Sequence, residues 1–189
     1  SEGYVKFTPV NNYDITKYAL DLAAQAAIHR GKSVVGLRFG TVNGWSPTLR
    51  TDVMINAMYA SAMANQQITV TNSHISRAIL GLEDLCRAME TIISIPRSGI
   101  YNLSSFNLTV REIANSVSKQ LNVPVIDNGA TDGVYDFALD CSLFKAMYGF
   151  TFHDAPSTIV DGLIKNYDSS QVGRRDQYIT YEWDSNGKL

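Results

Sequence analysis

The most constraining feature of the sequence is a helix pattern that runs directly into a buried-strand pattern. Residues 12–30 are rich in alanine and other small or apolar residues, and Gly31 follows as a typical helix C-terminal residue. Residues 33–39 are mostly apolar and lie between glycines, which is typical of a strand covered on both faces. A helix followed at once by such a strand is half of a β-α-β unit, so the sequence predicts an α/β fold with a parallel sheet.

The predicted helix also carries a tyrosine and a lysine, Tyr13 and Lys17, which share one face because they lie one turn apart. An ammonium group close to a phenol favours the phenolate and lowers the tyrosine pKa from about 10. Such a tyrosine can exchange a proton with a substrate hydroxyl near neutral pH. The spacing alone is a weak signal, since most helices that carry both residues do so by chance.

Composition and charge exclude several classes of protein. The 189 residues carry a net charge of −2, with 45% hydrophobic and 18% charged residues, so we expect a globular protein and no nucleic-acid partner. No apolar run approaches the roughly 20 residues that span a bilayer, and no signal-peptide pattern is present, so we expect a cytoplasmic protein without membrane contact. The three histidines match no metal-ligand spacing, and Cys86 and Cys141 are expected to be buried thiols.

The rest of the chain alternates short strands and helices, followed by a polar tail. Strands are expected at 67–70, 77–82, 101–103, 123–126 and 135–139. Helices are expected at 52–65 with Asp52 as cap, from Glu83 to before Pro96, at 109–121 with a capping box at Thr109 and Glu112, from Asp140 to Gly149, and from Ser157 to about Tyr167. Residues 40–50 are expected to be a loop, and residues 168–189 an extended or partly disordered segment.

One expected dinucleotide-binding motif is missing from the chain. A Gly-x-Gly-x-x-Gly turn between a strand and a helix cradles the pyrophosphate in such folds. Gly36, Gly40 and Gly44 are each four residues apart and lie at the end of a strand, so they do not form it. The segment before Tyr13 is too short to supply one, so we expect the first half of the unit to lie outside these residues.

Five motifs in order resemble a known family. They are the helix with Tyr13 and Lys17, the run Leu37–Gly44, the group Ser46, Pro47, Arg50, Asp52 and Asn56, the pair Arg77 and Asp84, and the run Tyr101–Ser104. From about residue 8 to 165, this set resembles the C-terminal half of the extended short-chain dehydrogenases/reductases, the NAD-dependent epimerases/dehydratases of nucleotide sugars. The resemblance implies the C-terminal part of a Rossmann-type doubly wound fold plus a small mixed α/β substrate-binding subdomain. It places the end of the dinucleotide-binding domain at 1–44, the substrate-binding subdomain mainly at 45–167 and a tail at 168–189.

The resemblance also implies a catalytic and cofactor site. Tyr13 is the expected general acid/base, and Lys17 is expected to hold the nicotinamide ribose and to depress the tyrosine pKa. Phe39, Gly40 and Thr41 are expected to face the nicotinamide and the sugar, where a threonine hydroxyl still donates a hydrogen bond. The implied cofactor is NAD or NADP, with NAD preferred.

The implied substrate is a nucleoside-diphosphate sugar, contacted by Thr41, Arg50, Asn56 and Arg77. Guanidinium groups match phosphate geometry, although both arginines read from the sequence alone as solvated surface charges. Arg38, inside an apolar strand, is expected to lie against a carboxylate. Two departures from the family pattern bear on substrate identity: no arginine lies near 135–139, and Gly81 stands where many members have histidine.

The function implied by the resemblance is epimerisation, dehydration or reduction of the sugar by transient hydride transfer. The expected partners are a second copy, through the helix that carries Tyr13 and Lys17, and an N-terminal Rossmann half in the same or a separate chain. Two alternatives stay open. One is a non-catalytic substrate-binding or dimerisation module, and the other is a reductase of a non-sugar carbonyl, which would keep Tyr13 and Lys17 but not need Arg50 and Arg77.

Overall fold

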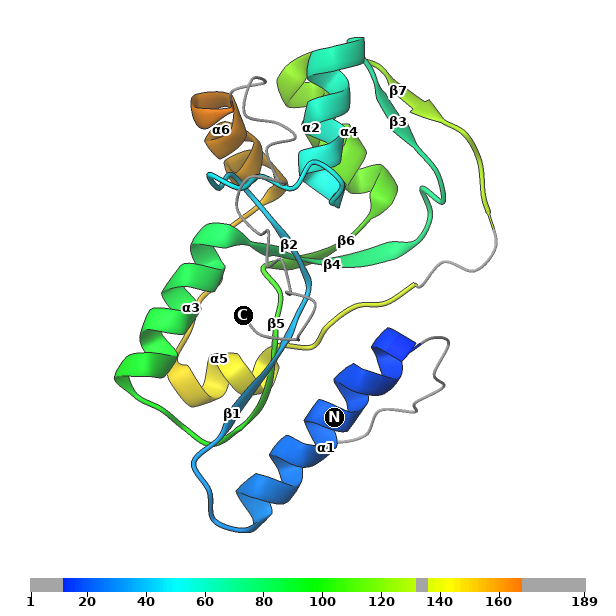
Figure 1. The fold of residues 1–189 in the computed structure, drawn as a ribbon. Helices are drawn as coiled ribbons and strands as arrows, with labels where there is room; N and C mark the ends of the chain where they lie inside the picture. Colours follow the sequence, from blue (N-terminus) through cyan, green and yellow to red (C-terminus); the bar gives the residue numbers. More distant parts are fainter. Residues whose placement is uncertain (1–11, 132–135, 168–189) are drawn as a thin grey trace, which may run out of the picture.

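The computed structural model describes residues 12–131 and 136–167. Its first layer is a parallel strand pair flanked by helices on both sides, α1 on one and α3 with α5 on the other (Figure 1). The strands are β1 (Val35–Phe39) and β5 (Gly99–Leu103), and the helices are α1 (Asn12–His29), α3 (Leu82–Ser94) and α5 (Ser142–Tyr148). The predicted α/β class with a parallel sheet is therefore confirmed.

The second part of the molecule is a mixed sheet with a separate strand pair and three helices. The sheet has the order β2-β4-β6, with β2 (Thr41–Asn43) parallel to β4 (Ser76–Gly81) and β6 (Phe106–Thr109) antiparallel to it. The strands β3 (Ile68–Val70) and β7 (Val125–Asp127) form a parallel pair. The helices α2 (Met54–Asn65), α4 (Val110–Leu121) and α6 (Pro156–Asn166) gather beside these strands (Figure 1).

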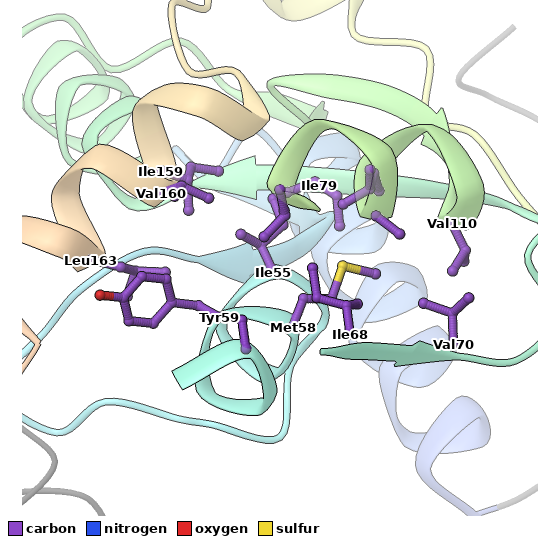
Figure 2. Packing of buried hydrophobic residues seen from close by; sticks show 14 of the residues in the cluster. Ile55, Met58, Tyr59, Ile68, Val70, Ile79, Val110, Ile159, Val160 and Leu163 are labelled. Carbon is purple, nitrogen blue, oxygen red and sulfur yellow. The ribbon is translucent and has the colours of Figure 1, made fainter. Parts of the chain in front are cut away.

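Each part buries its own hydrophobic cluster. The larger cluster joins α2, α4 and α6 to β3 and β4, with Ile55, Ile68, Val117 and Leu163 among its buried members (Figure 2 shows the packing around Ile55 and Ile68). The smaller cluster joins α3, β5 and α5 around Phe144. Burial of apolar side chains supplies the main driving force for both, at roughly 25 cal/mol for each Å² removed from water.

Gly40 lies where the chain passes from β1 into β2 and thus from the first sheet to the second. Its N–H donates to the Leu103 carbonyl over 2.8 Å. A Cβ at this position would lie 2.8 Å from the Ala78 carbonyl oxygen. A side chain there would push the two strands apart, so the crossing requires glycine.

Helix α1 is attached to the first layer along one side. None of its residues is buried, and four large apolar side chains on it are exposed: Tyr13, Ile15, Leu20 and Leu22. Arg38 of β1 forms an ion pair with Asp21 of α1 over 2.8 Å, between Nε and Oδ2. The prediction that Arg38 lies against a carboxylate is confirmed.

Most predicted elements are present, with small shifts at their ends. The helix α5 stops at Gly149, as predicted, and Asp140 accepts the Ser142 N–H at its start, although the N-cap residue is Cys141. The capping box at Thr109 is also present.

Five local predictions are wrong. Asp52 does not cap α2, because it pairs with Arg50, and α6 begins at Pro156 rather than after a Ser157 cap. Residues 41–43 form β2 within the predicted loop, because they pair with β4, a partner distant in sequence. Residues 136–139 form no strand (Val134, Tyr135 and the tail 168–189 lie outside the described residues), and Cys86 is exposed, although Cys141 is buried.

The capping box predicts a measurable loss of stability for Thr109→Ala. The Thr109 hydroxyl accepts the Glu112 N–H, and the Glu112 carboxylate accepts the Thr109 N–H over 2.8 Å. Removing the cap is expected to lower the free energy of unfolding by about 1 kcal/mol in urea titrations. The variant Thr109→Ser is expected to retain most of the stability that the cap contributes. Equal losses in both variants would contradict this role.

The same capping box predicts that the stability of the protein depends on pH. The hydrogen bond from the Thr109 N–H, followed by that from its hydroxyl, lowers the pKa of Glu112. The stability contributed by this carboxylate is therefore present above its unfolded pKa and is lost as the pH falls through the lower folded value.

Candidate functional site

The Tyr13–Lys17 pair lies at the carboxyl end of the parallel strands. Helix α1 runs antiparallel to β1, so its first turns lie beside the ends of β1 and β5 (Figure 1). The Lys17 ammonium is 5.3 Å from the centroid of the Tyr13 ring, and Tyr13 is 68% exposed. Since ligands of open α/β sheets bind outside the carboxyl ends of the strands, an exposed phenol is available where a ligand would lie.

Phe39, Gly40 and Thr41 occupy the same strand end. The Phe39 ring is 46% exposed, Gly40 is buried at the sheet crossing, and Thr41 begins β2 opposite Ile79 of β4. These three consecutive residues therefore offer an exposed aromatic side chain, a glycine at which two strands approach closely, and a hydroxyl group.

Asn56 holds the loop that carries Arg50. Its amide oxygen accepts the Gly44 N–H over 3.0 Å, and its amide nitrogen donates to the carbonyls of Gly44 and Arg50 over 3.2 and 2.9 Å. Asn56 is 3% exposed. In this conformation its side chain acts on the loop, and direct contact with a diphosphate would require these hydrogen bonds to break.

Arg50 is an exposed cation at the end of that loop. Its Nη2 lies 2.7 Å from Asp52 Oδ2, and its Nε lies 3.0 Å from Oδ1 of the same carboxylate. The hydrogen bond with Asp52 raises the pKa of Arg50 further. An incoming phosphate would compete with Asp52 for this guanidinium.

Arg77 is half-buried near the start of β4, where residues 136–137 run beside the strand. Its guanidinium carbon lies 5.8 Å from the centroid of the Phe137 ring. Burial lowers the pKa of Arg77, and the Asp136 carboxylate raises it. The structure thus gives Arg77 two neighbours on the segment that precedes α5.

The structure brings some of the predicted site residues into contact and leaves others on separate elements. It brings Tyr13 and Lys17 together on α1 and links Asn56 to the Arg50 backbone. Arg77 lies on β4, apart from both α1 and the loop that carries Arg50.

Sequence reasoning missed Asn43, which organises this region from within β2. Its amide oxygen accepts the Ile55 N–H over 2.8 Å and the Asn56 N–H over 3.4 Å, so it caps α2 in place of Asp52. Asn43 is 1% exposed. Its only sequence signal is an asparagine before a glycine, which does not reveal a partner twelve residues away.

Asp84 is a second organising residue whose partners were not predicted. This carboxylate, 1% exposed, accepts the N–H groups of His153 and Asp154 and the hydroxyl of Ser105, at 2.7 to 3.0 Å. It also pairs with Arg87 over 2.7 Å. It therefore fixes the segment before α6 to the start of α3.

The same network accounts for glycine at position 81. The Asp154 carboxylate accepts the Asp84 N–H over 2.9 Å, and a Cβ at Gly81 would overlap that carboxylate. A histidine at position 81 would require Asp154 to move.

Within residues 12–131 and 136–167, no cluster of three or more potential ligands could hold a metal ion. No helix in these ranges has both the length and the apolar character needed to cross a membrane.

The parallel layer, the crossing at Gly40 and the tyrosine–lysine helix at the strand ends together define a Rossmann-type α/β protein with a strand-end site. The chain belongs to the NAD-dependent epimerase/dehydratase family, whose family model matches residues 1–104. The search of curated proteins finds no match.

Solved structures with the same fold span a longer chain. The chain is similar to dTDP-glucose 4,6-dehydratase from Bacillus anthracis in complex with NAD, with 20% identity, a TM-score of 0.69, and coverage of 87% of this chain and 57% of that one. For ADP-L-glycero-D-manno-heptose-6-epimerase from Helicobacter pylori the values are 20%, 0.71, 84% and 52%. For RMD from Pseudomonas aeruginosa in complex with NADPH they are 17%, 0.68, 84% and 56%. The chain thus spans about half the length of these proteins.

Proposed function

We propose that this chain is the catalytic-helix and substrate half of an NAD(P)-dependent epimerase/dehydratase that acts on a nucleoside-diphosphate sugar. The observation that carries the proposal is the exposed Tyr13 with Lys17 over its ring, at the strand ends of a family member. NAD bound to the Bacillus dehydratase and NADPH bound to RMD support the cofactor class.

In the proposed mechanism the chain's residues orient the sugar and move a proton. The Tyr13 hydroxyl takes a proton from, or gives one to, a sugar hydroxyl or keto oxygen. Lys17 would hold the nicotinamide ribose, beside the Tyr13 ring that its ammonium group already faces. The Thr41 hydroxyl donates a hydrogen bond to the sugar. The bound nicotinamide supplies hydride chemistry, for which the protein provides geometry and electrostatics.

The residues of this chain fit one end of a dinucleotide. Exposed Phe39 and the strand-end crossing at Gly40 suit a flat nicotinamide ring. The 189 residues contain no glycine fingerprint for the pyrophosphate. We therefore infer that an N-terminal Rossmann half, in the same or another polypeptide, completes the cofactor site.

The strand arrangement supports this division. Among the described residues, β1 pairs only with β5, and the first layer is a two-stranded sheet. Residues 1–44 would then end the dinucleotide-binding domain, residues 45–167 would mainly form the substrate-binding subdomain, and 168–189 the tail. The exposed apolar residues of α1 suit the interface of a homodimer.

The substrate's diphosphate would lie against the two arginines. Arg50 and Arg77 supply guanidinium groups that match phosphate oxygens. Asn56 acts as a positioning residue for the Arg50 loop, through the hydrogen bonds to Gly44 and Arg50.

The variant Arg77→Ala tests the substrate class. Loss of a charge-assisted hydrogen bond is expected to weaken UDP binding by roughly 10-fold or more in calorimetric titration. The matched control is Arg30→Ala, which removes an exposed arginine just beyond the C-terminal end of α1. Unchanged affinity in Arg77→Ala would contradict the phosphate role and favour a non-sugar carbonyl substrate.

A further inference from the structure

The carboxylate of Asp136 is fixed by a hydrogen bond to Ser76, the residue directly before the arginine that the proposed function assigns to the diphosphate. Asp136 Oδ1 accepts the Ser76 N–H over 2.8 Å, and the Phe137 N–H donates to the Ser76 carbonyl over 3.3 Å. These two hydrogen bonds dock residues 136–137 onto the residue directly before Arg77. The Phe137 ring then lies 5.8 Å from the Arg77 guanidinium carbon.

A phosphate that binds Arg77 therefore approaches a cation that already has a carboxylate nearby. Burial lowers the pKa of Arg77, and the negative charge of Asp136 partly offsets this effect. Asp136 is exposed, so solvent and salt screen its charge, and its competition with an anion for Arg77 is moderate.

We propose that Asp136 is a specificity-determining residue that shares Arg77 with the ligand and weakens binding in proportion to the ligand's negative charge. This inference rests on the proposed function. It means that the site favours an intact nucleoside-diphosphate sugar, with one charge on each phosphate, over the free nucleoside diphosphate, whose terminal phosphate carries a second charge above about pH 6. The site would thereby discriminate against a hydrolysed substrate.

The variant Asp136→Asn tests the proposal with little change of shape. The asparagine keeps an oxygen that can accept the Ser76 N–H, and it removes the charge. At pH 8 and low salt, affinity is expected to rise by about fivefold for UDP and by a smaller factor for UDP-glucose. Both gains are expected to shrink at high salt. Asp161→Asn on α6, whose carboxylate accepts a hydrogen bond from Gln120, is the control with the same change of net charge.

Two outcomes would overturn the proposal. The first is an unchanged affinity, or an equal gain for both ligands, in Asp136→Asn. The second is a gain that persists in the double variant Asp136→Asn/Arg77→Ala, because the carboxylate would then act on the ligand without Arg77. If Arg77→Ala alone leaves UDP binding unchanged, both the proposed phosphate role of Arg77 and the present inference fail. If Arg77→Ala weakens UDP binding while Asp136→Asn has no effect, only the present inference fails.

Discussion

Replacing Tyr13 by phenylalanine is expected to lower kcat by about 10²- to 10⁴-fold, because the proton-transferring hydroxyl is lost. Phenylalanine keeps the ring over which the Lys17 ammonium lies at 5.3 Å, so the helix surface is otherwise preserved. The Kd for the nucleotide sugar is expected to change by less than about threefold. Turnover is measured with the complementary dinucleotide-binding half present.

The control for this variant is Tyr18→Phe, which removes a hydroxyl from the same helix one residue beyond Lys17. It is expected to retain most of the activity. A Tyr13→Phe protein with unchanged kcat would contradict a catalytic role. Such a result would favour a non-catalytic binding module in which Tyr13 and Lys17 have no chemical task.

Asp84→Ala is expected to lower the free energy of unfolding by about 3–5 kcal/mol, because several donors lose a buried acceptor at once. The carboxylate accepts the backbone N–H groups of His153 and Asp154 and the Ser105 hydroxyl. Asp84→Asn is expected to destabilise nearly as much, since its NH₂ group would face these donors. Urea titration followed by circular dichroism measures the loss.

Glu83→Gln is the matched control, because Glu83 is exposed in the same first turn of α3. It is expected to stay within about 0.5 kcal/mol of the parent. If Asp84→Ala unfolds at the same urea concentration as the parent, the network does not hold the segment before α6 in solution.

The sequence predicted features that depend on local patterns. The helix from Asn12, the strand that follows it and the capping box at Thr109 all rest on residues within one or two turns of each other. The tyrosine–lysine pair was predictable for the same reason, since helical spacing alone puts both residues on one face.

Features that depend on distant partners were not predictable. The strand β2 exists because it pairs with β4, and α2 is capped from Asn43 rather than from the nearer Asp52. The hydrogen bonds between the Asn56 amide and the loop that carries Arg50 were not predicted, because the sequence does not determine the course of that loop. The neighbours of Arg77 likewise come from a segment sixty residues further along the chain.

The most direct test of the central claim is mass spectrometry of the small molecules released when the purified protein is denatured. The 189-residue chain is compared with the same chain joined to a dinucleotide-binding half from the family. We predict that NAD or NADP is released only when that half is present, because the chain contains no glycine fingerprint for the pyrophosphate. One equivalent of dinucleotide released from the 189 residues alone would contradict the account.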